Sequence, residues 1–137
     1  MTACRRHALL SWVLLLIVDL TIAWGGFPRL HRLIRGVRVQ RHGTPPDGTA
    51  IVAAVNDAID RAAVWYPRTM QCLPRSAVAT WLLRRHGVAA VMVIGVRKMP
   101  FYAHAWVEVD GRVVNDVAKV QALYPAIDRL VPREAVR

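Results

Sequence analysis

The feature that most constrains the fold is an unbroken apolar run, VAAVMVIGV, at residues 88–96. Its short length and its β-branched residues predict a buried β-strand rather than a helix. Further along, HAWVEVDGRVVNDV at residues 104–117 places Asp110-Gly111 between two strand-like halves, which is a typical signal for a β-hairpin. Together the two stretches predict a small antiparallel sheet.

Helical patterns precede these strands. Apolar residues recur at helical spacing through AIVAAVNDAIDRAAVW at residues 50–65, and Pro67 ends that segment. A second helix is expected to begin just after Cys72, because Pro74 suits a first helical turn and Gly87 a C-terminal stop. Helices followed by an antiparallel sheet predict the α+β class, with the cysteine-bearing helix packed on the sheet.

The N-terminal part is apolar and basic. Residues 8–27 resemble a signal peptide or a membrane span, but Asp19 lies within them, and a central Asp costs about 3 kcal/mol on insertion scales. We therefore interpret residues 8–40 as one or two apolar helices that pack on the domain, on a partner, or peripherally on a membrane surface.

A Pro- and Gly-rich stretch, HGTPPDG, follows at residues 42–48. Such a stretch typically marks a break between structural segments. It predicts two parts: an N-terminal helical segment at 1–45 and a domain at 46–137. After residue 118, a short helix is expected to follow Tyr124-Pro125.

The net charge is +10, from 17 Arg and 2 Lys against 9 acids. This charge favours acidic partners such as nucleic acid, anionic lipid or an acidic peptide, although compositional bias of the genome explains it equally well. Aromatic residues are few and do not alternate with the basic ones, which disfavours nucleic acid. Cys4 and Cys72 occur in contexts too different for a disulfide framework, so a cytoplasmic, reducing setting is the simpler expectation.

Cys72 and His104 are candidates for nucleophilic catalysis. A thiol reacts as its thiolate, and the positive end of a helix dipole at Cys72 favours that form. A histidine beside a thiol acts as a base only when a third group orients its ring. On the other hand, a lone buried thiol is usually structural, and Ser76, one turn further on, is expected to pack rather than react.

Three residues could orient His104: Asp110, Asn115 and Asp116. Asp110 lies about 20 Å away along an extended strand. Asp116 faces His104 if the hairpin loop has three residues, Val109 to Gly111, because cross-strand neighbours on one face lie about 5 Å apart. We expect this loop, a type I turn with Gly111 in a bulge.

This register also puts Trp106 and Val114 on the face of His104, with Val113 and Asn115 on the other face. A two-residue loop would instead turn Asp116 to the opposite face. Trp106 and Trp81 are expected in the core. Arg84, Arg85 and His86 are expected in the last turn of their helix, facing the negative end of its dipole.

Cys72, His104 and Asp116 are thus the expected nucleophile, base and orienting group. The backbone N–H of Cys72 is one expected oxyanion donor. A second donor is left open among Gln71, Trp65 and Tyr66.

The stretches CLPRSAVATWLLRRHGVAA at 72–90 and VIGVRKMPFYAHAWVEVDGRVVNDV at 93–117 resemble the leader peptidases of lasso-peptide biosynthesis. The resemblance covers about residues 64–120. It implies a transglutaminase-like, papain-related core and assigns the nucleophile, histidine and acid to Cys72, His104 and Asp116.

The resemblance also implies an activity. Leader peptidases of this kind cut the leader from a ribosomally made precursor peptide, after which a macrolactam cyclase closes the ring. Only about 45 residues precede the Pro-Gly break, and no winged-helix recognition module fits there. A separate leader-recognition protein is therefore the expected partner, and no cofactor is expected.

Two other functions stay open. Papain-related cores also serve acyltransferases of the transglutaminase and arylamine acetyltransferase types, which share the thioester chemistry. The other alternative is a non-catalytic, membrane-associated scaffold. A metal site built from His104, Glu108 and Asp110 is disfavoured, because no second histidine is near in the sequence.

Overall fold

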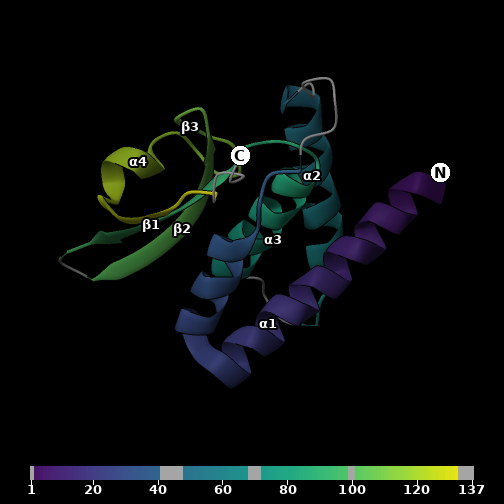
Figure 1. The fold of residues 1–137 in the computed structure, drawn as a ribbon, viewed down its shortest axis with the longest axis horizontal. Helices are drawn as coiled ribbons and strands as arrows, with labels where there is room; N and C mark the ends of the chain where they lie inside the picture. Colours follow the sequence, from purple (N-terminus) through teal and green to yellow (C-terminus); the bar gives the residue numbers. More distant parts are fainter. Residues whose placement is uncertain (1, 41–47, 68–71, 99–100, 133–137) are drawn as a thin grey trace.

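A layer of helices packs against a small sheet in the computed structural model, which describes residues 2–40, 48–67, 72–98 and 101–132 (Figure 1). The predicted α+β class is confirmed, while most of the expected break at 42–48 lies outside the described residues. In chain order the elements are α1 (Thr2–Gly36), α2 (Gly48–Val64), α3 (Cys72–Arg85), β1 (Val91–Arg97), β2 (Tyr102–Val109), β3 (Arg112–Val113), α4 (Val120–Leu123) and β4 (Ala126–Leu130).

Helix α1 is bent into two arms, which form a V in Figure 1. The bend lies at Gly26, whose φ of 66° is accessible to glycine at little cost, and Pro28 follows it. Leu15 on the first arm and Leu30 on the second are fully buried, so the apolar N-terminal segment packs on the domain as one of the expected alternatives. By length and hydropathy, Arg6–Gly36 would also suffice to cross a membrane.

Helices α2 and α3 pack against each other and against the first arm of α1. Ile59 of α2 and Leu83 of α3 lie in one buried cluster with Leu15 of α1. Helix α3 ends in a Schellman motif: the N–H of Gly87 donates to the carbonyl of Arg84, and that of Val88 to Leu83. The predicted glycine stop is confirmed, with Gly87 at a φ of 87°.

The sheet is antiparallel and has the strand order β3-β2-β1-β4. One face packs on the helices through Ala105 and Val107 of β2. The opposite face carries Val93 and Trp106, which pack with Val120 of α4. Trp106 is 1% exposed, which confirms its expected place in the core.

The expected short helix after Tyr124-Pro125 is wrong. The helical turn, α4, comes before Tyr124, and the residues after Pro125 form β4. The N–H of Val96 donates to the carbonyl of Pro125, and β4 then pairs with β1. This strand satisfies the backbone groups of β1 that would otherwise form an open edge, a requirement that local sequence does not reveal.

Arg84 lies in the last turn of α3, as expected, but its side chain also has a role that the sequence did not predict. It is fully buried, and its guanidinium donates to the carbonyls of Ile34, Ala90 and Leu130 at 2.5, 2.9 and 2.5 Å. A further hydrogen bond goes to Val37. Burial lowers the pKa of Arg84 to about 10, so it stays charged at neutral pH. It joins the end of α1, the start of β1 and the end of β4.

Candidate active site

The hairpin between β2 and β3 has a two-residue loop, so the expected three-residue register is wrong. Glu108 pairs with Val113, and Val109 with Arg112. Asp110 and Gly111 have φ values of 52° and 77°, as in a type I′ turn, whose twist matches that of the flanking strands. The faces expected for Val113 and Val114 are consequently exchanged: Val113 packs beside Trp106, and Val114 toward the helices.

Asp116 nevertheless reaches His104. The ladder ends at Val113, and one further backbone hydrogen bond runs from the N–H of Val114 to the carbonyl of Val107. The chain then bends through residues 114–116, and Asp116 Oδ2 lies 2.5 Å from His104 Nε2. The pair forms because the chain leaves the sheet, not because the two residues face each other in a ladder.

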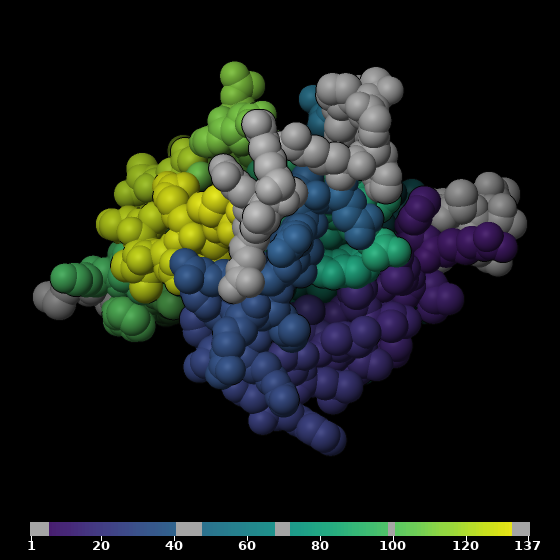
Figure 2. Space-filling view, viewed as in Figure 1, coloured from purple at the N-terminus to yellow at the C-terminus, as the bar shows by residue number. Residues whose placement is uncertain are grey.

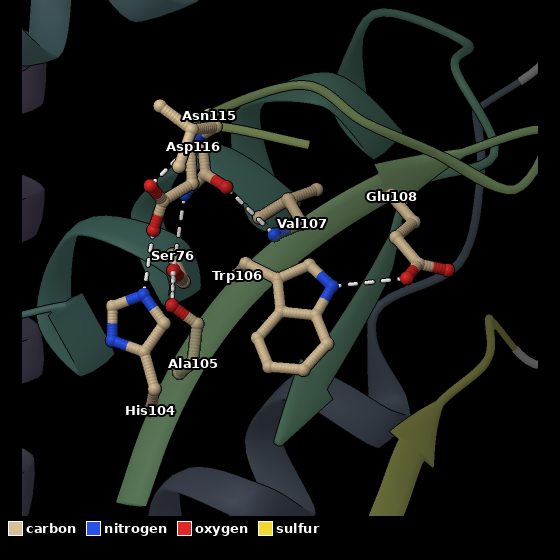
Figure 3. A network of polar contacts seen from close by, with 9 residues as sticks. Ser76, His104, Ala105, Trp106, Val107, Glu108, Asn115 and Asp116 are labelled. Carbon is tan, nitrogen blue, oxygen red and sulfur yellow. Dashed lines mark hydrogen bonds and ion pairs between the residues drawn. The ribbon is translucent and has the colours of Figure 1, made fainter. Parts of the chain in front are cut away.

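Asn115 and Ser76 hold this bend in place (Figure 3). Asn115 Oδ1 accepts the N–H of Val107 at 2.7 Å, and its Nδ2 donates to Ser76 Oγ at 3.0 Å. Ser76 is fully buried and donates in turn to the carbonyl of Ala105 at 3.1 Å. Sequence reasoning considered Asn115 only as a rival to Asp116, but its role here is to tie helix α3, strand β2 and the bend together.

The ring of His104 is fixed by three side chains. The Asp116 carboxylate accepts a hydrogen bond from Nε2 of the imidazole, so Nδ1 is the ring nitrogen left for another partner. The rings of Trp106 and Tyr124 lie 6.1 and 5.1 Å from the imidazole, centroid to centroid. The His104 side chain remains 25% exposed, so a substrate can approach it.

Gly95 makes room for this arrangement. It faces His104 across the β1–β2 ladder. A Cβ at residue 95 would lie 2.7 Å from both the Trp106 indole and the Tyr124 carbonyl oxygen. Neither group can give way easily, because the indole is rigid and the carbonyl belongs to the backbone. Only glycine lets both aromatic residues pack beside the histidine.

Glu108 anchors Trp106, whose ring packs beside His104. Its carboxylate accepts from Trp106 Nε1 at 2.9 Å, Gln121 Nε2 at 2.8 Å and Arg129 Nη1 at 2.6 Å. Burial by itself raises the pKa of Glu108, but these hydrogen bonds and the charge of Arg129 outweigh it and lower the pKa. The charged carboxylate of Glu108 therefore has a structural role, because it holds the side chains of Trp106, Gln121 and Arg129 together.

Cys72 begins α3 as expected and is half-buried. It packs against the cluster that contains Ala105, the residue after His104. Ser76 lies four residues after Cys72 on the same helical face. Its hydroxyl donates a hydrogen bond to the carbonyl of Ala105. The structure thus joins His104 and Asp116 directly. Among the described residues, no hydrogen bond links Cys72 to either.

Of the candidates for a second oxyanion donor, Gln71 lies outside the described residues, and the Tyr66 hydroxyl donates to Asp19 at 3.1 Å. A polar cavity of about 110 Å³ lies beside the bend, between α2 and α3. Its walls include Asn115 and Arg75, and Arg75 pairs with Asp60 across it.

Comparison with known proteins identifies the family of the chain. The model of the transglutaminase-like superfamily matches residues 14–128. The microcin J25-processing protein McjB of Escherichia coli is 44% identical over 50 residues, which cover 36% of this chain. The chain spans about a quarter of that protein's length, the match covering 24% of it. No solved structure gave a significant match. A helix that begins at a cysteine, a histidine–aspartate pair beside a small antiparallel sheet and a family match over most of the sequence agree: the chain belongs to the transglutaminase-like superfamily.

Proposed function

We propose that the chain is a cysteine peptidase that removes the leader from a ribosomally made lasso-peptide precursor. The observation that carries the proposal is the hydrogen bond between His104 Nε2 and Asp116 Oδ2, which orients the imidazole as a general base requires. Similarity to a microcin-processing protein supports the substrate class. The cysteine at the start of α3 supports the choice of nucleophile.

In the proposed reaction, the Cys72 thiol transfers its proton to Nδ1 of His104, the ring nitrogen that Asp116 does not occupy. The thiolate attacks the carbonyl carbon of the last leader residue, and the carbonyl oxygen becomes an oxyanion. The backbone N–H of Cys72, at the positive end of the α3 dipole, would stabilise that charge. Asp116 keeps the ring oriented and stabilises the imidazolium.

When the tetrahedral intermediate collapses, the C–N bond breaks and His104 gives its proton to the departing amine of the core peptide. The leader remains on Cys72 as a thioester. A water molecule, deprotonated by His104, then attacks this thioester and releases the leader carboxylate and the free thiol. The freed amine is the group that a macrolactam cyclase requires.

The partners belong to the same proposal. A separate leader-recognition protein presents the precursor, and a macrolactam cyclase consumes the product. The setting is the cytoplasm, where a reducing environment keeps Cys72 free for catalysis. Neighbouring genes for a short precursor, a small recognition protein and a cyclase would support this assignment.

The test is mass spectrometry of the precursor peptide incubated with the full chain, with and without the recognition protein. We expect the wild type to release leader and core, and Cys72→Ala to release neither while keeping the circular dichroism of the wild type. Cys4→Ala, which removes the other cysteine of the sequence, is the matched control and should process normally. Processing by Cys72→Ala would refute the assignment.

The acyltransferase alternative differs only in what resolves the thioester. Processing is repeated with a primary amine such as methylamine present, and the leader product is weighed. A peptidase yields the leader carboxylate, whereas an acyltransferase yields the leader amide. A scaffold function predicts neither product and no alkylation of Cys72 by iodoacetamide at neutral pH.

A further inference from the structure

An exposed apolar face runs along the first arm of α1. Its large side chains recur every three or four residues, as they must to share one face of a helix. They are Leu9, Val13, Ile17, Leu20 and Trp24, which are 65, 39, 50, 48 and 85% exposed. In Figure 2 this arm forms the purple surface at the lower right, and no other described element crosses over it there. Such a continuous apolar face on a folded chain marks a contact site.

The opposite side of the same arm is occupied by the protein. Leu15 is fully buried in the cluster shared with α2 and α3. Asp19, the only acid between residues 6 and 40, accepts a hydrogen bond from the Tyr66 hydroxyl at the end of α2. The acid that makes this segment a poor membrane span is therefore turned away from the exposed face.

The exposed formal charges in the same segment all have one sign. Arginines are exposed at both ends of the apolar face, along the second arm of α1 and just after it: they are Arg6, Arg29, Arg32, Arg35 and Arg38. Trp24 and Phe27 stand at the bend between the two arms, exposed by 85 and 39%. Tryptophan side chains are enriched in the zone between lipid headgroups and acyl chains.

We propose that α1 lies flat on an anionic membrane surface. The face from Leu9 to Trp24 enters the boundary between headgroups and acyl chains, and the arginines contact lipid phosphates. A spanning orientation is disfavoured, although the length and mean hydropathy of 2.0 would allow it. Spanning would remove Leu15 from the core and carry Asp19 into hydrocarbon.

Charge complementarity selects the membrane over a second copy of this chain. Two copies meeting through this face would bring together two molecules of net charge +10 and the arginines of both. An anionic bilayer offers acyl chains to the apolar face and, next to them, negatively charged headgroups to the arginines. The proposal is independent of the peptidase activity, because none of these residues belongs to the candidate active site.

The test is co-sedimentation of the purified full chain with two kinds of vesicle: phosphatidylcholine alone, and phosphatidylcholine mixed with phosphatidylglycerol. We expect binding to the mixed vesicles, weakened by added salt, and little binding to the neutral ones. Replacing one exposed arginine, as in Arg32→Gln, should lower partitioning about fivefold.

A matched pair of leucines tests the apolar face. Leu20 of α1 and Leu123 of α4 are 48 and 51% exposed, and α4 lies on the far side of the sheet from α1 (Figure 1). Leu20→Ser should lower partitioning about tenfold, and Leu123→Ser should not change it. Brominated lipid should quench the fluorescence of the wild type more than that of Trp24→Phe.

Three results would overturn the proposal: no sedimentation of the folded wild type with mixed vesicles, equal loss in Leu20→Ser and Leu123→Ser, or a dimer without vesicles that Leu20→Ser dissociates. The last result would assign the face to a second copy of the chain. A circular dichroism spectrum of Leu20→Ser equal to that of the wild type would show that the variant folds.

Discussion

His104 Nε2 and Asp116 Oδ2 lie 2.5 Å apart, although the β2–β3 register does not pair the two residues. The contact depends on the bend after Val114, which Asn115 fixes to Val107 and to Ser76. The orientation of the proposed base thus depends on a short segment outside the ladder.

Replacing Asp116 by Asn should lower kcat/KM for precursor processing by about 10²–10⁴-fold, because an amide no longer stabilises the imidazolium. The loss should stay smaller than that of Cys72→Ala, which removes the nucleophile. Asp110→Asn is the matched control, since Asn is well tolerated in a type I′ turn. Equal activity of the Asp116 and Asp110 variants would exclude Asp116 as the orienting group.

Adding one methyl group at Gly95 should damage both stability and activity. The new Cβ of Gly95→Ala would meet the Trp106 indole and the Tyr124 carbonyl at 2.7 Å. We expect the free energy of unfolding to fall by about 1–3 kcal/mol, measured by urea denaturation, with reduced processing because the rings beside His104 shift. Gly36→Ala, whose new Cβ would meet no atom within 4 Å beyond its chain neighbours and its own helix backbone, should be neutral.

Arg84 should be irreplaceable even by lysine. Its guanidinium reaches four carbonyls on three segments, and an ammonium group cannot reproduce that planar set of donors. Arg84→Lys should therefore lower the free energy of unfolding by about 2–4 kcal/mol. Its neighbour Arg85 is exposed and lies over the Trp81 ring at 5.1 Å. Arg85→Lys should change stability by less than about 0.5 kcal/mol, and a loss as large as that of Arg84→Lys would show that the buried contacts of Arg84 are not special.

Glu108 should make the folded state sensitive to acid. Its pKa is lowered on folding, so its contribution is complete above the ordinary pKa of 4.5 and is lost as the pH falls through the lower folded value. Glu108→Gln should lower the free energy of unfolding at pH 7 by about 1–3 kcal/mol, and by less in acid.

Urea denaturation between pH 7 and pH 3 measures this effect. Asp57→Asn is the control, because the Asp57–Arg61 pair is more than half exposed on both sides and is expected to contribute little. If the difference in the free energy of unfolding between wild type and Glu108→Gln did not shrink in acid, the charge of Glu108 would not stabilise the fold.

Much of the architecture could be predicted from local sequence. The apolar period of α2, the glycine stop after α3 and the β-branched run of β1 each place an element, because these patterns act over a few neighbouring residues. The cysteine at the start of a helix also follows from the sequence. The contact between His104 and Asp116 was predicted as well, although the loop length from which it was predicted is wrong.

The sequence alone determined the order of the elements from α2 to β3, the charge, the apolar N-terminal segment and the chemical types at residues 72, 104 and 116. Only the tertiary structure decided the loop register, the identity of β4, the burial of Arg84 and the bend that brings Asp116 to His104. The physical reason is one of distance: propensity and periodicity are local properties. By contrast, a buried guanidinium, an edge strand and a side-chain network depend on carbonyls, backbone edges and neighbours supplied by segments remote in the chain.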